Sequence, residues 1–166
     1  EIERILHWYS QLKGICYATL RYFNAGGYDL NGRIQGLEQN SANLLPIVMK
    51  TALGRRASLN IFGNNYNTPD GTGIRDYIHV TDLATAHVSS LEYLRNKQKN
   101  LTLNLANGEG YSVLDVIKTA EKITGKIIPF KIIDRRAGDP SNMVAISKFA
   151  KNKINWDCSY SDIETI

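Results

Sequence analysis

The sequence predicts an α/β protein, because residue patterns typical of strands alternate with patterns typical of helices along its 166 residues. The helical patterns end in glycines and several begin at capping residues, whereas the strand patterns are short apolar runs bounded by turn residues. Hydrophobic residues make up 43% of the chain and charged residues 22%, which is an ordinary balance for a globular protein. The chain can therefore bury the core of one domain or somewhat more.

The first third of the chain contains two predicted helices with a predicted strand between them. Apolar residues recur at helical spacing over 2–12 and stop before Gly14, a suitable residue for a left-handed helix end. Residues 15–23 form a β-rich run. A second helical pattern covers 44–53 and ends at Gly54, and its proline is tolerated because it lies in the first turn.

The remaining two thirds continue the alternation. Thr81 is the predicted N-cap of a long amphipathic helix, and 101–106 alternates apolar residues with threonine and asparagine, as a strand does. Ser112 begins a capping box for a helix that ends at Gly125. The run 127–133 is the next predicted strand.

The two ends of the sequence predict a piece of a longer protein. No residue before Ile2 can serve as an N-cap, so the first helix is expected to be already in progress. At the other end, Ser161 and Glu164 form a capping box, and the sequence stops two residues later. We expect a new helix to begin there.

Charge and cysteine usage narrow the possible partners. A net charge of +4 and a pI near 9.0 admit nucleic-acid binding, but the sequence lacks a sustained basic stripe and an RNA-binding signature. Cys16 and Cys158 lie far apart without metal-ligand spacing, so no metal site is predicted. No stretch resembles a membrane span or a signal peptide. We predict a cytoplasmic protein with neither a nucleic-acid nor a membrane partner.

The segment 58–80 carries the strongest indication of a binding site. A short apolar strand pattern runs into a Gly-rich loop that presents Arg75 between polar and aromatic neighbours. A guanidinium beside flexible backbone N–H groups suits a phosphate or diphosphate, because its donors meet two oxygens at once and its charge is permanent. An ordinary surface loop with a solvated arginine is the alternative.

Three further polar groups flank predicted elements. Arg21–Asn24 ends a strand, Asn43 and Leu44 begin a helix, and Arg135–Asp139 follows a strand. Ligands of open α/β sheets sit at the carboxyl ends of strands, and helix N-termini favour anions. From the residues alone, each segment has an alternative. Arg21–Asn24 can be a strand end with a buried aromatic pair, Asn43 a simple helix cap, and Arg135–Asp139 a solvated turn.

Together these runs resemble the UDP-glucose 4-epimerases of the extended short-chain dehydrogenase/reductase group, and the resemblance extends over the whole chain. The runs that carry it are Leu20–Asn24, Asn43–Pro46, Ser58–Gly63, Asp70–Val80 with Asp82 and Leu83, and Arg135–Asp139. The resemblance implies a Rossmann-type NAD-binding domain, to which 1–30 and 81–107 would belong. Residues 31–80 and 108–166 would then form the smaller α/β domain that binds a UDP-sugar, and the N-terminal half of the enzyme would be absent.

The resemblance also implies a role for individual residues. Tyr22 would lie at the nicotinamide end of NAD, and Phe23 and Asn24 would border the sugar diphosphate. The remaining residues would hold the substrate: Asn43 and Leu44 at the diphosphate and nucleotide, Asn60, Ile61 and Phe62 at the uridine, Arg75 and Arg136 at the diphosphate, Asp139 at the ribose hydroxyls, Tyr77 as support for these contacts, and Met143 on the far wall of the sugar pocket.

The activity implied is interconversion of UDP-galactose and UDP-glucose through a 4-keto intermediate with bound NAD, in a homodimer that serves galactose metabolism. The family's Gly-rich NAD loop and its catalytic Tyr-x-x-x-Lys pair are expected before Glu1 and not in this chain, so we predict no catalytic residue here and no activity of the chain alone. A related nucleotide-sugar dehydratase or decarboxylase, a UDP-N-acetylglucosamine 4-epimerase and, remotely, a basic nucleic-acid-binding module are the alternatives.

Overall fold

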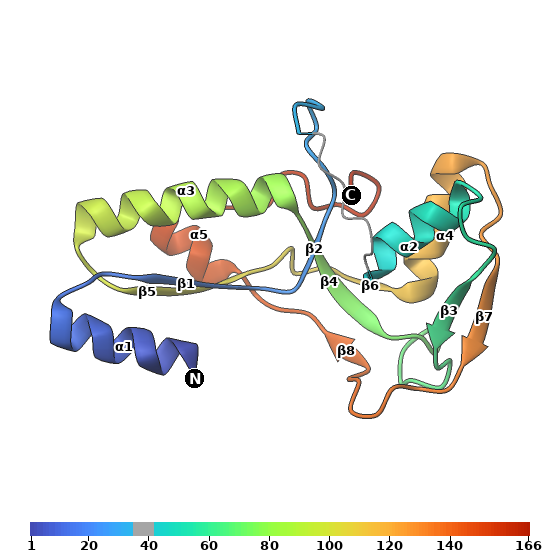
Figure 1. Cartoon of the computed structure of the whole chain (residues 1–166), viewed down its shortest axis with the longest axis horizontal. Helices are drawn as coiled ribbons and strands as arrows, with labels where there is room; N and C mark the ends of the chain where they lie inside the picture. Colours follow the sequence, from blue (N-terminus) through green and yellow to red (C-terminus); the bar gives the residue numbers. More distant parts are fainter. Residues whose placement is uncertain (35–41) are drawn as a thin grey trace.

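The computed structural model describes residues 1–34 and 42–166 and has the predicted α/β character (Figure 1). Helices and strands alternate along most of the chain. Their bounds are α1 Ile2–Lys13, β1 Ala18–Tyr22, β2 Asn24–Gly26, α2 Leu44–Ala52, β3 Leu59–Phe62, β4 Ile74–His79, α3 Val80–Lys97, β5 Leu101–Leu105, β6 Gly110–Ser112, α4 Val113–Thr124, β7 Phe130–Ile133, β8 Asn142–Met143 and α5 Lys148–Ile154.

The strands of the described residues form three small groups, and β4 lies in the middle one. β1 pairs in parallel with β5, and β3 pairs in parallel with β7. Between them, β4 pairs in parallel with β2 and β8 and antiparallel with β6. Figure 1 shows α1, β1, β5, α3 and α5 on one side of β4 and α2, β3, α4 and β7 on the other.

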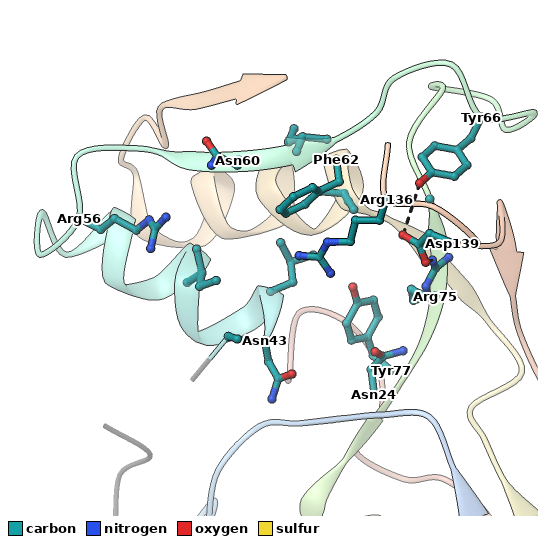
Figure 2. Close-up of a pocket in the computed structure, with 16 residues that line it drawn as sticks. Asn24, Asn43, Arg56, Asn60, Phe62, Tyr66, Arg75, Tyr77, Arg136 and Asp139 are labelled. Carbon is teal, nitrogen blue, oxygen red and sulfur yellow. Dashed lines mark hydrogen bonds and ion pairs between the residues drawn. The ribbon is translucent and has the colours of Figure 1, made fainter. Parts of the chain in front are cut away.

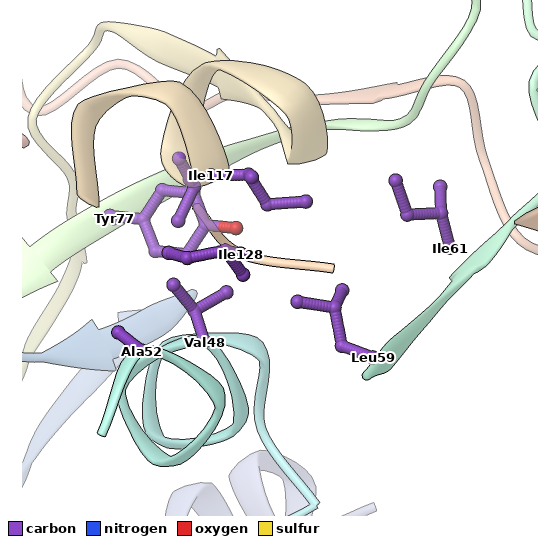
Figure 3. Close-up of a cluster of buried hydrophobic side chains, with 8 residues drawn as sticks. Val48, Ala52, Leu59, Ile61, Tyr77, Ile117 and Ile128 are labelled. Carbon is purple, nitrogen blue, oxygen red and sulfur yellow. The ribbon is translucent and has the colours of Figure 1, made fainter. Parts of the chain in front are cut away.

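Two hydrophobic cores correspond to these two sides, and β4 contributes to both. Successive side chains of a strand point in opposite directions, so Tyr77 enters one core while Ile78 enters the other. The first core lies among α2, β3 and α4 and consists of Val48, Ala52, Leu59, Ile61, Tyr77, Val116, Ile117 and Ile128 (Figure 3). The second consists of Ile78, Leu83, Ala86, Leu101, Leu103, Leu105, Ala150 and Trp156.

The second core bears on the predicted domains. Ala150 and Trp156 belong to the segment that we expected in the smaller domain, yet they pack with residues of α3 and β5 from 81–107. The indole Nε1 of Trp156 also donates to the backbone oxygen of Asp82, at 2.9 Å. The domain boundaries stay a prediction, and this packing favours grouping α5 with the β1–β5 layer.

Two buried carboxylates tie distant segments to β4 and α3. Asp76 accepts hydrogen bonds from the backbone N–H groups of Asn107 and Gly108, each at 3.0 Å. Asp82 accepts from the backbone N–H groups of Ser159 and Tyr160, each also at 3.0 Å. Burial raises the pKa of Asp76, while these backbone bonds favour its ionised form. The loop after β5 is thereby fixed against β4, and the C-terminal segment is fixed against the start of α3.

Local patterns predicted some element ends correctly and others wrongly. Ser112 forms the expected capping box and Gly14 the expected left-handed helix end. Thr81 is not the cap of α3, because the imidazole Nδ1 of His79 accepts from the N–H of Thr81 at 3.0 Å. The strand expected over 127–133 begins only at Phe130.

Ser161 is not the predicted cap. Asp162 takes that place, since its carboxylate accepts from the N–H of Thr165 at 2.9 Å and its backbone oxygen accepts from the N–H of Ile166 at 3.1 Å, the bonds of a first helical turn. Ser161 is buried, its hydroxyl donates to Asp82 at 2.5 Å, and the same oxygen accepts from the backbone N–H of His79 at 2.9 Å. A side chain used in this way cannot cap a helix. Among residues 1–34 and 42–166, no helix is long and apolar enough to cross a membrane.

Candidate functional site: a cavity between α2, β3 and β4

A cavity of about 520 Å³ lies between α2, β3 and β4 (Figure 2). Ten of the predicted substrate-binding residues line it. The described lining consists of Asn24, Ala42, Asn43, Leu44, Ile47, Arg56, Asn60, Ile61, Phe62, Tyr66, Gly73, Arg75, Tyr77, Val113, Arg136 and Asp139. Residues far apart in the sequence thus meet around one space, as the resemblance implies.

An aromatic ring and a guanidinium form the middle of the cavity. Phe62 is the last residue of β3, and Arg136 follows the paired strand β7. The guanidinium carbon of Arg136 lies 3.7 Å from the centre of the Phe62 ring. A planar base and a phosphate can both be met here, because aromatic rings stack with flat ligands and arginine donates to phosphate oxygens.

At one end of the cavity, Arg75 and Asp139 form an ion pair. Nη2 of Arg75 lies 2.5 Å from Oδ1 of Asp139, and the two side chains are 16% and 32% exposed. Nη1 of Arg75 donates to the backbone oxygen of Ile74 at 2.7 Å, and the hydroxyl of Tyr66 donates to Asp139 at 3.4 Å. Two of the five guanidinium N–H donors of Arg75 are used in this way, so three remain for a ligand.

Tyr77 and Asn24 lie on the paired strands β4 and β2 beside this ion pair. The side-chain amide of Asn24 donates to the backbone oxygen of Asp76 at 2.9 Å, which fixes its orientation. Tyr77 is only 3% exposed, and burial raises the pKa of its hydroxyl to about 12. This hydroxyl therefore stays protonated near neutral pH and is a hydrogen-bonding group rather than a base.

The Gly-rich loop differs from our expectation of free backbone N–H groups. The N–H of Tyr66 donates to Gly71 O at 2.9 Å, and the N–H of Gly71 donates to Thr68 O at 3.2 Å. The N–H of Thr72 donates to the carboxylate of Asp70 at 2.8 Å. The loop therefore bonds largely to itself, and it contributes Tyr66 and Gly73 to the cavity rather than a set of free donors.

Three predicted site residues are not among the described residues that line the cavity: Tyr22, Phe23 and Met143. Tyr22 ends β1, is partly exposed, and its ring centre lies 6.3 Å from that of His87. Met143 on β8 pairs in register with Arg75 and is partly exposed. The roles assigned to these three residues stay predictions.

Sequence reasoning missed six of the lining residues, of which Arg56 and Tyr66 are the most polar. Arg56 is one of two adjacent exposed arginines after α2, and only the fold distinguishes it from its neighbour Arg55. Tyr66 lies in the Gly-rich loop, and no neighbouring residue in the sequence indicates that its hydroxyl contacts Asp139.

We expected no Tyr-x-x-x-Lys motif in this chain, but the spacing of that motif does occur in it. Tyr9 and Lys13 on α1 have it, and so do Tyr93 and Lys97 on α3. Neither pair belongs to the described lining of the cavity. Helical residues four apart share a face, so this spacing arises readily on any helix and does not by itself identify a catalytic pair.

The cavity of this α/β fold brings arginines, an aromatic ring and an ion pair together, and comparison with known proteins identifies the family. The model of the NAD dependent epimerase/dehydratase family matches residues 1–106, and the chain belongs to this family. It is 45% identical to a UDP-glucose 4-epimerase of Halalkalibacterium halodurans over 165 residues, which are 99% of this chain and 49% of that protein.

Solved structures agree with this assignment and confirm the predicted fold class. The UDP-glucose 4-epimerase of Brucella ovis in complex with NAD superposes with a TM-score of 0.94 at 41% identity, over 99% of this chain and 50% of that one. The enzyme from Stenotrophomonas maltophila, with bound NAD and formylated UDP-arabinopyranose, gives 0.92 at 38% identity, over 99% and 49%. The chain thus spans about half the length of the relatives it matches.

Proposed function

We propose that the protein containing this chain is a UDP-glucose 4-epimerase, which interconverts UDP-galactose and UDP-glucose with bound NAD, and that this chain holds the substrate by its UDP handle. The observation that carries the proposal is the cavity in which Arg75 of β4, Phe62 of β3 and Arg136 of the segment after β7 meet. The relatives named UDP-glucose 4-epimerase, and the neighbour solved with a UDP-sugar, support the choice of ligand.

The proposed contacts follow the chemistry of the lining residues. Arg75 and Arg136 bind the diphosphate, because charge-assisted donors suit its oxygens. Phe62, with Asn60 and Ile61, binds the uridine, and Asp139 accepts from the ribose hydroxyls. Asn24, Asn43, Leu44 and Tyr77 complete the wall, and Phe23 is proposed to border the sugar diphosphate. The roles of the lining residues are supported by their presence around one cavity.

The reaction explains why the strong contacts are made to the UDP part of the substrate and not to its sugar. The sugar must present both faces of C4 in turn, so it has to rotate within the site. Contacts to the unreactive UDP retain the sugar while leaving it free to turn, and binding energy from remote groups can thus serve the chemical step. The neutral hydroxyl of Tyr77 and the amide of Asn24 can donate to the sugar without holding it by charge.

NAD supplies hydride transfer at C4 when it is bound. In this chain, Tyr22 is the residue proposed to contact it, and the location of Tyr22 at the carboxyl end of a parallel strand supports this assignment. The partly exposed ring leaves a surface that a flat ligand can cover. The other NAD contacts and the catalytic Tyr and Lys are proposed to lie in the half of the enzyme that this chain does not cover.

The full-length protein should convert UDP-galactose to UDP-glucose, which chromatography of the nucleotide sugars measures directly. Failure to convert either sugar would refute the proposed activity. The 166-residue chain alone, even with added NAD, should give no product. Product from the chain alone would refute the proposed division of the machinery.

The N-acetylated substrates are a second candidate, and Met143 is the observation that favours them. Met143 is flexible, partly exposed and in register with Arg75 beside the cavity. We propose that the enzyme also accepts UDP-N-acetylhexosamines. The same chromatographic assay with UDP-N-acetylglucosamine tests this, and turnover below about a thousandth of that on UDP-glucose would contradict it, because a merely tighter apolar pocket costs only ~1–3 kcal/mol.

We further propose that the enzyme is a cytoplasmic homodimer of galactose metabolism. Exposed apolar side chains of α1, including Ile2, Ile5, Trp8 and Leu12, and of α3, including Val88 and Leu91, support burial against further protein. Sedimentation of the full-length protein at several concentrations tests the dimer. A monomer at micromolar concentration would contradict it.

A further inference from the structure

Tyr66 lines the cavity and has no role in the proposal above. Its backbone N–H donates to the oxygen of Gly71 at 2.9 Å, and the residue is only 5% exposed. A Cβ added at Gly63 would lie 3.0 Å from Cε2 of Tyr66, so the ring packs closely on the backbone there. The Gly-rich loop and the residue after β3 thus hold the ring in one position.

The hydroxyl of Tyr66 points at the ion pair of Arg75 and Asp139 (Figure 2). It donates to Oδ2 of Asp139 at 3.4 Å, whereas Nη2 of Arg75 lies 2.5 Å from Oδ1. Figure 2 shows Tyr66 and Arg75 approaching the carboxylate from different sides. The two oxygens of Asp139 therefore have different partners.

The contact between Arg75 and Asp139 is single, although arginine and carboxylate groups frequently form two parallel hydrogen bonds. Nη1 of Arg75 donates to the backbone oxygen of Ile74 at 2.7 Å. The guanidinium lies against Gly73, where an added Cβ would be 3.2 Å from Nη1. A second bond, to Oδ2 of Asp139, would take one of the three N–H donors that Arg75 keeps for a ligand.

Resting on the proposed function, we infer that Tyr66 is a positioning residue for the diphosphate contact: its bond to Oδ2 keeps Asp139 from closing on Arg75 with both oxygens, and so preserves the donors with which Arg75 binds phosphate. Removing the hydroxyl leaves Oδ2 without this donor in a partly buried site, where its attraction to the adjacent cation is strong. The carboxylate then forms a second bond to the guanidinium, and the ligand has to displace it.

Calorimetric titration of the full-length protein with inorganic pyrophosphate tests this inference in a double-mutant cycle. Tyr66→Phe removes only the hydroxyl and keeps the buried ring, and it should weaken pyrophosphate binding about three- to tenfold. In an Asp139→Asn background, the same substitution should change the affinity by less than about 1.5-fold, because a neutral amide forms no ion pair with Arg75. Asp139→Asn alone should bind pyrophosphate more tightly than the unaltered protein.

Tyr111→Phe is the matched control. Tyr111 pairs in register with Arg75 and its hydroxyl donates to Glu109 at 2.7 Å, but it is not among the described residues that line the cavity. This variant should leave the pyrophosphate affinity unchanged in both backgrounds. In the complete reaction, Tyr66→Phe should raise the KM for UDP-galactose and leave kcat nearly unchanged, since the diphosphate is bound equally before and during the chemical step.

The outcomes separate this inference from the proposed function. Undiminished pyrophosphate binding by Tyr66→Phe overturns the inference alone. An equal loss in both backgrounds makes the hydroxyl a support for the cavity wall and not for Asp139, which also overturns it. Weaker binding by Asp139→Asn than by the unaltered protein overturns it without any variant of Tyr66. Failure of the unaltered protein to bind pyrophosphate would instead refute the diphosphate contacts of the proposed function.

Discussion

Replacing Arg75 and Arg136 with glutamine, singly and together, tests whether the two guanidiniums share one diphosphate. A hydrogen bond to a charged group contributes about 1.5–3 kcal/mol, so each single variant should weaken pyrophosphate and UDP by about ten- to a hundredfold. Arg75→Gln should cost more than Arg136→Gln. It removes a cation and also leaves the partly buried carboxylate of Asp139 uncompensated beside the anion.

That asymmetry supplies an internal check. Adding Asp139→Asn to Arg75→Gln removes the repelling charge, so the double variant should bind pyrophosphate more tightly than Arg75→Gln alone. Arg135→Gln is the matched control, because Arg135 is adjacent to Arg136 and stacks on the ring of Tyr66 but is not itself among the described residues that line the cavity. It should leave pyrophosphate binding unchanged.

Calorimetric titration of the full-length variants gives the coupling free energy between Arg75 and Arg136. Groups that contact one ligand are expected to couple by about 0.5–3 kcal/mol, whereas distant and independent groups add within about 0.5 kcal/mol. Pyrophosphate binding that is indifferent to both substitutions would refute the convergence of the two arginines on one diphosphate. Strictly additive losses would refute it as well.

Two further predictions concern stability. Burial lowers the pKa of His79, so the folded protein binds fewer protons there than the unfolded chain, and stability is lost as the pH falls below about 6.5. Urea titrations at several pH values should show that His79→Asn flattens this decline. His7→Asn, on the exposed helix α1, is the control and should not flatten it. Gly71 has φ +79° and an added Cβ would lie 2.1 Å from the backbone oxygen of Asn64. Gly71→Ala should therefore lower the free energy of unfolding by at least about 2 kcal/mol more than Gly138→Ala, which shares the positive φ but meets nothing; equal losses would contradict the clash.

The same kind of sequence pattern succeeded at Ser112 and failed at Ser161, and the difference is physical. The partner of Ser112 is Asp115, three residues away, so the capping box is a local structure that the sequence specifies directly. The hydroxyl of Ser161 is instead used by Asp82, which is 79 residues away and buried. A tertiary hydrogen bond in the interior outweighs a local preference, and no window of neighbouring residues contains it.

The site was predictable for a related reason, and only in part. The runs around Phe62, Arg75 and Arg136 carry a family resemblance, so their convergence could be expected before the fold was known. Arg56 and Tyr66 could not, because each reaches the cavity only through the course of the chain around it. The sequence alone indicates that Arg56 is a solvated surface residue. It lines the cavity because β3 turns back beside α2.

The distribution of charge in the cavity suggests how binding and rearrangement can coexist. The fixed charges of Arg75, Asp139 and Arg136 lie at the middle and one end, and Tyr77 beside them is held neutral by burial. A charged contact to the hexose would favour one orientation of the sugar and slow its rotation, whereas neutral donors can exchange between hydroxyl groups at small cost. Under the proposed function, Arg75 and Arg136 meet the chemically inert diphosphate, and the neutral donors Tyr77 and Asn24 beside them meet the sugar that must turn.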